Sequence, residues 1–464
     1  MPVLCDPSFM HRVVLGCVLV LTGCTDRPLA ETTDATATTS TTSTTASPET
    51  TVAAPTDTDA PPSPTSSSHP TTTDPALTTD TTDSALTTGT PDTTSTSPPD
   101  TTSTTDATTD TTTTDALPAC GECPATWVHA GHLDLQPGAD LTPFICLGEV
   151  TGHFSLVGDF TAAELAVFAN LRHTARFALG DNAVLTDLSA FACLETASQG
   201  IFLVGAPALA DISALAGVTT ASELELSDLA ITALPPFAPG FGELHDITLI
   251  DLPHLTDLGP LAAANPGSSL SIQITGAPAL TSIAPLAGLI ASNDGHASIF
   301  LSGLATLPSL DGLAALSDGV LVLRDLPQVQ DLGPLADLVE LQHLEITGLP
   351  KITALADLGN LEVVDTFILG NCDAGPDIPG MDGLVDLSGL DSLVNAHIFQ
   401  IGGNQHLTAL TGAPALHQSF AVWASDNPAL TVADYDALLA QLDEPAQGCF
   451  GNGNRSCTCN TKEP

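Results

Sequence analysis

The 464-residue chain carries 54 acidic and 8 basic residues, which give a net charge of −46 at pH 7. A charge of this sign and size excludes nucleic acid as a partner, because the phosphate backbone would be repelled. No basic amphipathic stretch is present that would hold an anionic membrane surface.

The first residues have the composition of an export signal. An apolar run over 13–21 is shorter than the roughly 20 residues that span a bilayer, and it ends in Leu21–Cys24. This Leu-Thr-Gly-Cys segment resembles the lipobox of bacterial lipoproteins, and the resemblance implies cleavage of a 1–23 signal peptide and lipidation of Cys24. An ordinary secretory signal is the alternative. Thr25 in place of Asp favours the outer membrane in that family, so we expect an outer-membrane lipoprotein exposed on the cell surface.

Residues 24–118 form a second region, composed almost entirely of Thr, Ser, Asp, Pro and Ala. Such a composition cannot bury a core, which predicts a disordered stalk. Its carboxylates repel one another and extend it. Thr/Ser/Pro tracts also resemble mucin-type O-glycosylated segments.

A ladder of six apolar positions recurs through 156–430. One copy is Ile247, Leu249, Leu252, Leu255, Leu258 and Leu261, which steps by two once and then by three. The step of two is the alternation of a strand, whereas the steps of three suit a turn and a tight return. The second position, here called the marker, is occupied by Leu156, Leu179, Leu203, Leu226, Leu249, Ile274, Leu301, Leu323, Ile346, Leu369, Ile401 and Ala424.

A single coil of this kind cannot bury its apolar edge alone, so neighbouring coils must stack. We therefore predict an α/β-type solenoid, a right-handed coil of about 12 repeats of about 23 residues, with a parallel β-sheet on its concave face. The pattern resembles the leucine-rich repeat. The turns at 276–281 and 426–431 are similar to receptor L-domains, and the returns at 257–261 and 331–335 are similar to internalins. Leucine often replaces the turn asparagine of these families, so we expect leucine packing instead of a continuous amide ladder.

The cysteines predict stapled ends, an N-terminal cap over 119–155 and a C-terminal cap over 431–464. Eleven cysteines minus Cys5, Cys17 and Cys24 leave eight, and in an oxidising compartment disulfides are expected. A zinc site at Cys120 and Cys123 with His129 and His132, and a redox role for these two cysteines, are alternatives. Cys372 fits a buried free thiol, and helical spacing over 431–442 predicts a closing amphipathic helix. The disulfide candidates are Cys120, Cys123, Cys146, Cys193, Cys449, Cys457 and Cys459.

Side chains that flank the marker should point outward onto the sheet face. The row just before the marker, here called the ligand row, consists of Ala178, Phe202, Glu225, Thr248, Gln273, Phe300, Val322, Glu345, Ile368, Gln400 and Trp423. Exposed aromatic residues at regular spacing favour a ligand interface, and packing among neighbouring strands is the alternative. Our candidate ligand contacts are Phe202, Glu225, Gln273, Phe300, Arg324, Glu345, Gln400 and Trp423.

An insertion at 371–390 interrupts the period and carries Asp373, Asp377, Asp382 and Asp386. These are weak calcium candidates, and a solvated acidic loop is the alternative.

Motifs for metalloprotease, serine hydrolase and phosphate-loop chemistry are missing from the sequence, so we expect no enzyme and no cofactor. Three hypotheses follow. The first, implied by the resemblance, is a lipid-anchored surface protein that recognises a protein or glycan through the concave face. The second is a passive structural envelope lipoprotein, and the third is enzymatic or redox activity in the caps.

Overall fold

The computed structural model describes residues 120–238, 240–371 and 379–451, all within one compact unit. The signal peptide, the whole stalk with Cys24, Cys372, Asp373, Asp377, Cys457 and Cys459 lie outside the described residues. Among the described helices, none combines the length and apolar character needed to cross a bilayer.

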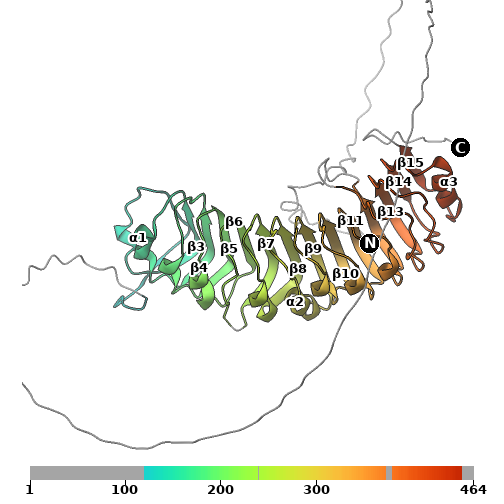
Figure 1. Cartoon of the computed structure of the whole chain (residues 1–464). Coiled ribbons are helices and arrows are strands. Elements are labelled where there is room, and N and C mark those ends of the chain that lie inside the picture. The colour runs from blue at the N-terminus through green and yellow to red at the C-terminus, as the bar shows by residue number, and fades with distance from the viewer. Residues whose placement is uncertain (1–119, 239, 372–378, 452–464) are drawn as a thin grey trace, which may run out of the picture. The chain divides into compact units, whose positions relative to one another are not determined.

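Strands of the described residues form one parallel sheet of 15 strands, which follow one another across it nearly in chain order (Figure 1). Only β2 leaves the sequential path, and it pairs with β3. The strands are β1 (Trp127–His129), β2 (Leu133–Leu135), β3 (Leu147–Val157), β4 (His173–Gly180), β5 (Thr196–Ala206), β6 (Glu223–Leu229), β7 (Gly242–Ile250), β8 (Asn265–Thr275), β9 (His296–Ser302), β10 (Asp318–Arg324), β11 (Glu340–Thr347), β12 (Val363–Gly370), β13 (Asn395–Gly402), β14 (Ala421–Ser425) and β15 (Gln447–Gly451).

Short helices make most of the return connections. The α-helices are α1 (Ala162–Leu165), α2 (Leu286–Ser292) and α3 (Val432–Ala440). The 3₁₀ helices are η2 (Thr142–Phe144), η3 (Ala166–Phe168), η4 (Ser189–Phe191), η5 (Ser213–Gly217), η6 (Gly259–Ala263), η7 (Asp311–Leu313), η8 (Gly333–Leu335) and η9 (Ala356–Leu358). The expected succession of strand, turn and tight return is confirmed, and the fold is a leucine-rich-repeat solenoid.

The marker residues are register partners from strand to strand, as the period predicts. Leu249 pairs with Ile274, and Ile274 with Leu301, and all three side chains are fully buried. The residues two positions earlier form a second buried column, which includes Phe154 and Phe177, stacked at 6.0 Å between ring centroids. These two columns are the core-facing side of the sheet.

Eleven of the twelve coils turn through a left-handed residue two positions after the marker, and in the remaining coil Gly370 is left-handed one position after Leu369. Asp181, Asp228, Asp251, Asp325 and Asp426 have φ between 50° and 55° there, and other coils place glycine at the same step. Aspartate and glycine tolerate this conformation better than other residues. The Asp and Gly of the repeated turn phrases are thus required by the backbone.

A second set of aspartates begins the returns. The carboxylates of Asp187, Asp211 and Asp257 accept hydrogen bonds from the backbone N–H two residues on, at 3.1, 2.8 and 2.7 Å. Bonds from Ser189 and Ser213 lower the pKa of Asp187 and of Asp211. Part of the acidity therefore serves the fold.

The amide ladder occurs only near the two ends of the array in the described residues. Buried Asn404 and Asn427 are joined through Asn404 Nδ2 and Asn427 Oδ1 at 3.0 Å, and Asn182 donates to the Phe160 carbonyl at 3.0 Å. Between them, fully buried leucines such as Leu252 and Leu326 take the same turn position. Leucine packing replaces the ladder there, as expected.

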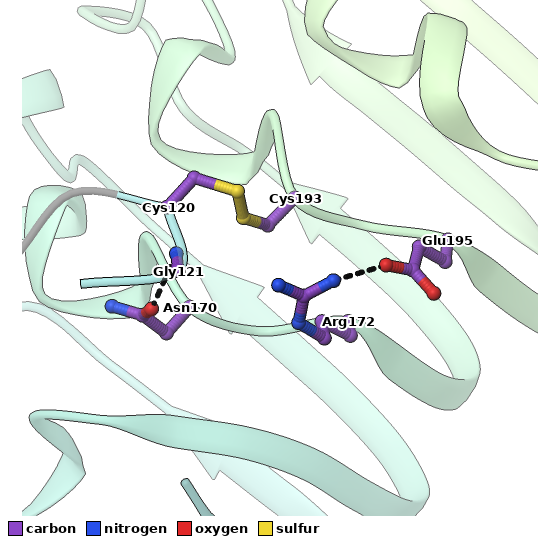
Figure 2. The surroundings of a disulfide bond; sticks show 6 residues. All are labelled: Cys120, Gly121, Asn170, Arg172, Cys193 and Glu195. Carbon is purple, nitrogen blue, oxygen red and sulfur yellow. Dashed lines mark hydrogen bonds and ion pairs between the residues drawn. A yellow bond between two sulfur atoms is a disulfide. The ribbon is translucent and has the colours of Figure 1, made fainter. Parts of the chain in front are cut away.

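Two disulfides hold the N-terminal end. Cys120 is bonded to Cys193 and Cys123 to Cys146, with Cα atoms 5.7 and 5.6 Å apart. Figure 2 shows the first bond beside Asn170, whose side-chain oxygen accepts from Gly121 N at 3.0 Å. These four disulfide candidates are confirmed, and the bonds occupy both cysteines of the zinc and redox alternatives.

The C-terminal end has the expected helix followed by one more strand. Thr431 and Asp434 cap α3 reciprocally, and Tyr435 is buried and donates to the Val422 carbonyl at 2.8 Å. Val432, the first residue of this helix, is 56% exposed, whereas Tyr435 and Leu438 are buried. Strand β15 then pairs with β14, so the sheet runs into the region assigned to the cap. The backbone of Cys449 lies in β15.

Replacement of a marker leucine should destabilise the whole stack. Leu301→Ala removes a fully buried side chain and should lower the free energy of unfolding by about 2–5 kcal/mol, because the cavity cannot close. Val184→Ala, at a side chain 49% exposed, is the control and should cost less than about 0.5 kcal/mol. Urea titration followed by circular dichroism measures both, and equal costs would contradict the shared core.

Candidate binding face

The ligand row lies in register across the sheet. Ala178 pairs with Phe202, Gln273 with Phe300, and Gln400 with Trp423. These residues alternate with the buried columns, so they lie on the opposite side of the sheet, here called the outer face. The candidate contacts therefore lie on the side of the sheet where we expected them. Seven directly precede a marker residue, and Arg324 directly follows one.

Exposure varies along this row. Glu225, Thr248, Gln273, Phe300, Ile368, Gln400 and Trp423 are half-buried, as expected of side chains on an open sheet face. Phe202, Val322 and Glu345 are instead buried, at 4%, 5% and 4% exposure. The expectation of exposure is wrong for Phe202 and Glu345, and the cause differs between them.

Phe202 is covered by an arginine from the neighbouring strand. The guanidinium carbon of Arg176 lies 3.5 Å from the centre of the Phe202 ring, a cation–π contact. This arrangement agrees with the alternative that an aromatic residue on the sheet packs against its neighbours. Whether Phe202 contacts a ligand stays a prediction.

Glu345 is held in a buried charge cluster. Arg324 reaches both carboxylate oxygens, through Nε to Oε1 and through Nη2 to Oε2 at 2.7 Å, and His343 Nε2 lies 3.8 Å from Oε2. Burial raises the pKa of Glu345, but His343 and Arg324 outweigh it, and the net pKa lies below the ordinary value of 4.5. Arg324 and Glu345 are thus brought together as structural partners.

The outer face is partly covered next to this cluster. Thr347 is fully buried, and its hydroxyl donates to the carbonyl of Pro379 at 3.2 Å. Pro379 belongs to the insertion at 371–390, so the described end of the insertion lies against the face at β11. The ligand row is therefore interrupted, with an accessible stretch on each side.

Two candidate metal sites were predicted from the sequence. The zinc candidate lies within the described residues, where both of its cysteines are disulfide-bonded, whereas the calcium candidate is described only in part. No group of three or more His, Cys, Asp or Glu in the described ranges is arranged to hold a metal ion. Asp386 accepts from Ser388 N at 2.9 Å, whereas Asp382 Oδ1 is buried without a hydrogen-bond partner. The calcium candidates Asp382 and Asp386 stay untested, since their two companions are not described.

A group on the outer face was missed by the sequence analysis. His153 and Arg176 are register partners on β3 and β4, and the His132 and His153 rings are 4.4 Å apart. They lie three positions before the marker, in an outward column that was not considered. The sequence contained the signal, because successive residues of a strand face opposite sides of the sheet. The residue three positions before the inward-facing marker therefore faces outward, as does the residue one position before it.

These features define a leucine-rich-repeat solenoid with a mixed apolar and charged outer face. No protein-family model matches the chain, and no curated protein matches it either. Similar solved structures include an internalin, InlF, from Listeria monocytogenes, at 20% sequence identity and a TM-score of 0.40, over 70% of this chain and 87% of that chain.

The charge cluster at Glu345 makes the stability depend on pH. Glu345→Gln should lower the free energy of unfolding by about 2 kcal/mol at pH 7, because it removes one partner of a buried ion pair. The Glu345 pKa is lowered by folding, so this contribution is present above its unfolded value of 4.5 and is lost as pH falls through the folded value.

Urea titrations of the wild type and the Glu345→Gln variant from pH 7 to pH 3 test this prediction. The gap between the two should narrow as the pH falls below about 4.5. Glu195→Gln, whose ion pair with Arg172 is more exposed, is the control and should change little at any pH. A gap at Glu345 that stays constant down to pH 3 would rule out the ion pair as its cause.

Proposed function

We propose that this chain is a cell-envelope-anchored binding protein that recognises a protein or glycan ligand through the outer face of its sheet. The observation that carries the proposal is the ligand row itself. One side chain from each successive strand lines up in register, and most of these side chains are half-buried instead of being used in the core. An array of aromatic, amide and charged side chains in register on one face of a sheet suits the recognition of a large ligand.

Two aromatic residues supply the anchors in this proposal. Phe300 lies beside Gln273 and Val322, and Trp423 lies beside Gln400. Both are only half-buried, so each retains apolar surface that a ligand can cover. Aromatic side chains of this kind dominate many interfaces because they bury a large area at a low cost in conformational entropy.

Alanine at both anchors should weaken binding strongly. For the Phe300→Ala/Trp423→Ala variant we expect a loss of at least about 100-fold in affinity for ligands found on protein and glycan arrays, since hot-spot truncations cost about 2 kcal/mol or more each. The full chain is the array probe. Phe420→Ala, at an aromatic residue 51% exposed and outside the ligand row, is the matched control and should bind as the wild type does. If the double variant binds these ligands as strongly as the wild type does, the ligand contacts lie outside the ligand row.

The anchor and the location are part of the same proposal and rest on the sequence. The Leu21–Cys24 segment supports lipidation of Cys24, and several acyl chains hold a protein on a membrane far more firmly than one. Residue 25 supports the outer membrane, and the stalk composition supports a spacer between the lipid and the solenoid.

Lipid labelling tests the anchor directly. Cells that express the chain should incorporate radiolabelled palmitate into it, and Cys24→Ser should abolish the label and release the chain from the membrane fraction. Cys17→Ser, within the signal, should leave the label unchanged. Protease treatment of intact cells then tests the location, because cleavage within 24–118 requires the stalk to lie outside. A labelled Cys24→Ser chain would overturn the lipoprotein proposal.

A further inference from the structure

Arg176 differs from the other lysines and arginines of the described residues in its side-chain contacts. The described residues contain four lysines and arginines, namely Arg172, Arg176, Arg324 and Lys351. Arg172 pairs with Glu195, Arg324 pairs with Glu345, and Lys351 donates to Gln328 at 2.7 Å. For Arg176 the described structure has no ion pair, and its Nε–H is buried without a hydrogen-bond partner. The side chain as a whole is only partly buried, so its terminal N–H groups can donate to an acceptor on a ligand.

The backbone is shaped to hold this side chain on the face. Next to Arg176 in β5 stands Gly200, with φ of +148°, and a Cβ there would lie 2.7 Å from the Glu223 carbonyl oxygen and 2.9 Å from the Phe202 ring. Only glycine fits, and its missing side chain leaves room for the Phe202 ring that the guanidinium covers. The register on both sides of β4 shifts just before Arg176, and such bulges re-aim side chains near functional sites.

Two histidines adjoin Arg176 on the outer face. His153 is the register partner of Arg176 on β3, and its Nε2 lies 3.1 Å from Gln199 Oε1. The exposed His132 lies against His153, and its Nδ1 accepts from the His153 backbone N–H at 2.9 Å. Arginine binds carboxylates through its planar fork, so this group fits an anionic part of a ligand.

Acidic side chains follow on the same face a short distance away. Glu225 lies in β6 and the exposed Asp246 in β7. At about 4.8 Å per strand, β6 and β7 are about 10 and 14 Å from β4. The face therefore changes sign from cationic to anionic over two to three strands.

This change of sign distinguishes between ligand classes. An acidic polysaccharide repeats its negative charge, so its next anionic groups would come to lie over Glu225 and Asp246 and be repelled. A polypeptide can present a carboxylate and a basic side chain at the required separation. Opposite charges placed in this way also select against wrong partners.

We propose that Arg176, with His153 beside it, binds a carboxylate side chain of a polypeptide ligand, while Glu225 and Asp246 bind a basic side chain of the same ligand. This inference rests on the proposed function, because it specifies which class of ligand the outer face takes. Under this proposal, charged residues of the first coils determine which ligands bind, and Phe300 and Trp423 remain the apolar anchors.

Synthetic peptides provide the probe. The full chain is applied at low salt to 15-residue peptides of Ser, Thr and Ala that carry one Glu and one Lys three or four residues apart, about 10–13 Å in an extended chain. Peptides with two Glu, two Lys or one charge only are the comparison, and a uronic acid polymer is a separate arm. We expect at least about tenfold preference for Glu–Lys peptides, with the preference lost above about 0.5 M salt.

Substitutions then test the residue. Arg176→Gln should reduce the binding of Glu–Lys peptides about tenfold, and Arg176→Glu should shift the preference to Lys–Lys peptides. Arg172→Gln, which removes a nearby arginine already paired with Glu195, is the matched control and should bind within about twofold of the wild type. Circular dichroism confirms that each variant is folded.

Three results would overturn the proposal. They are Glu–Lys peptides held no better than peptides with one charge, Arg176→Gln binding as well as the wild type, and a preference for the uronic acid polymer that depends on Arg176. The Phe300→Ala/Trp423→Ala variant separates this failure from that of the proposed function. If the binding of array ligands depends on the two aromatic residues while Arg176→Gln does not change peptide binding, the proposed binding face is supported and the proposed charge selection is wrong.

Discussion

The structure depends on burial shared between neighbouring coils. The marker residue and the residue two positions before it point into the core from each strand, where they contact the equivalent residues of the coils before and after. A coil taken alone would leave this apolar edge in water. The terminal coils have a neighbour on one side only, and here disulfides fasten one end while α3 and β15 follow the last full repeat at the other.

Acidic residues have a structural role that the net charge alone does not reveal. Aspartates in the left-handed turn position allow the chain to leave each strand, and others hold the first backbone N–H of the return. Both kinds recur from coil to coil and keep their carboxylates toward solvent or backbone donors. A strongly acidic surface and a regular solenoid are therefore compatible, since part of the charge lies where the turns require it.

The repeat could be predicted from the sequence because burial imposes a period that a single chain displays. The marker column and the leucines at 252 and 326 follow from spacing alone. The exposure of the outer face could not be predicted in this way, because it depends on contacts between different rows. Phe202 is covered from the preceding strand by Arg176, and Glu345 is held by Arg324 from one strand before. The partner of Cys120 was equally hidden, since Cys193 is distant in sequence and cysteine spacing does not encode pairing.

The covering of the sheet at β11 limits the geometry of whatever docks there. Buried Thr347 and Glu345 separate the stretch that contains Phe300 from the one that contains Gln400 and Trp423. Strand β13 is four inter-strand steps from β9, about 19 Å at ordinary strand spacing. Under the proposed function, a ligand that engages both stretches has to span this covered strip. It does so as one continuous surface or as two modules joined by a linker, and in the second case the tether length would govern the gain in avidity.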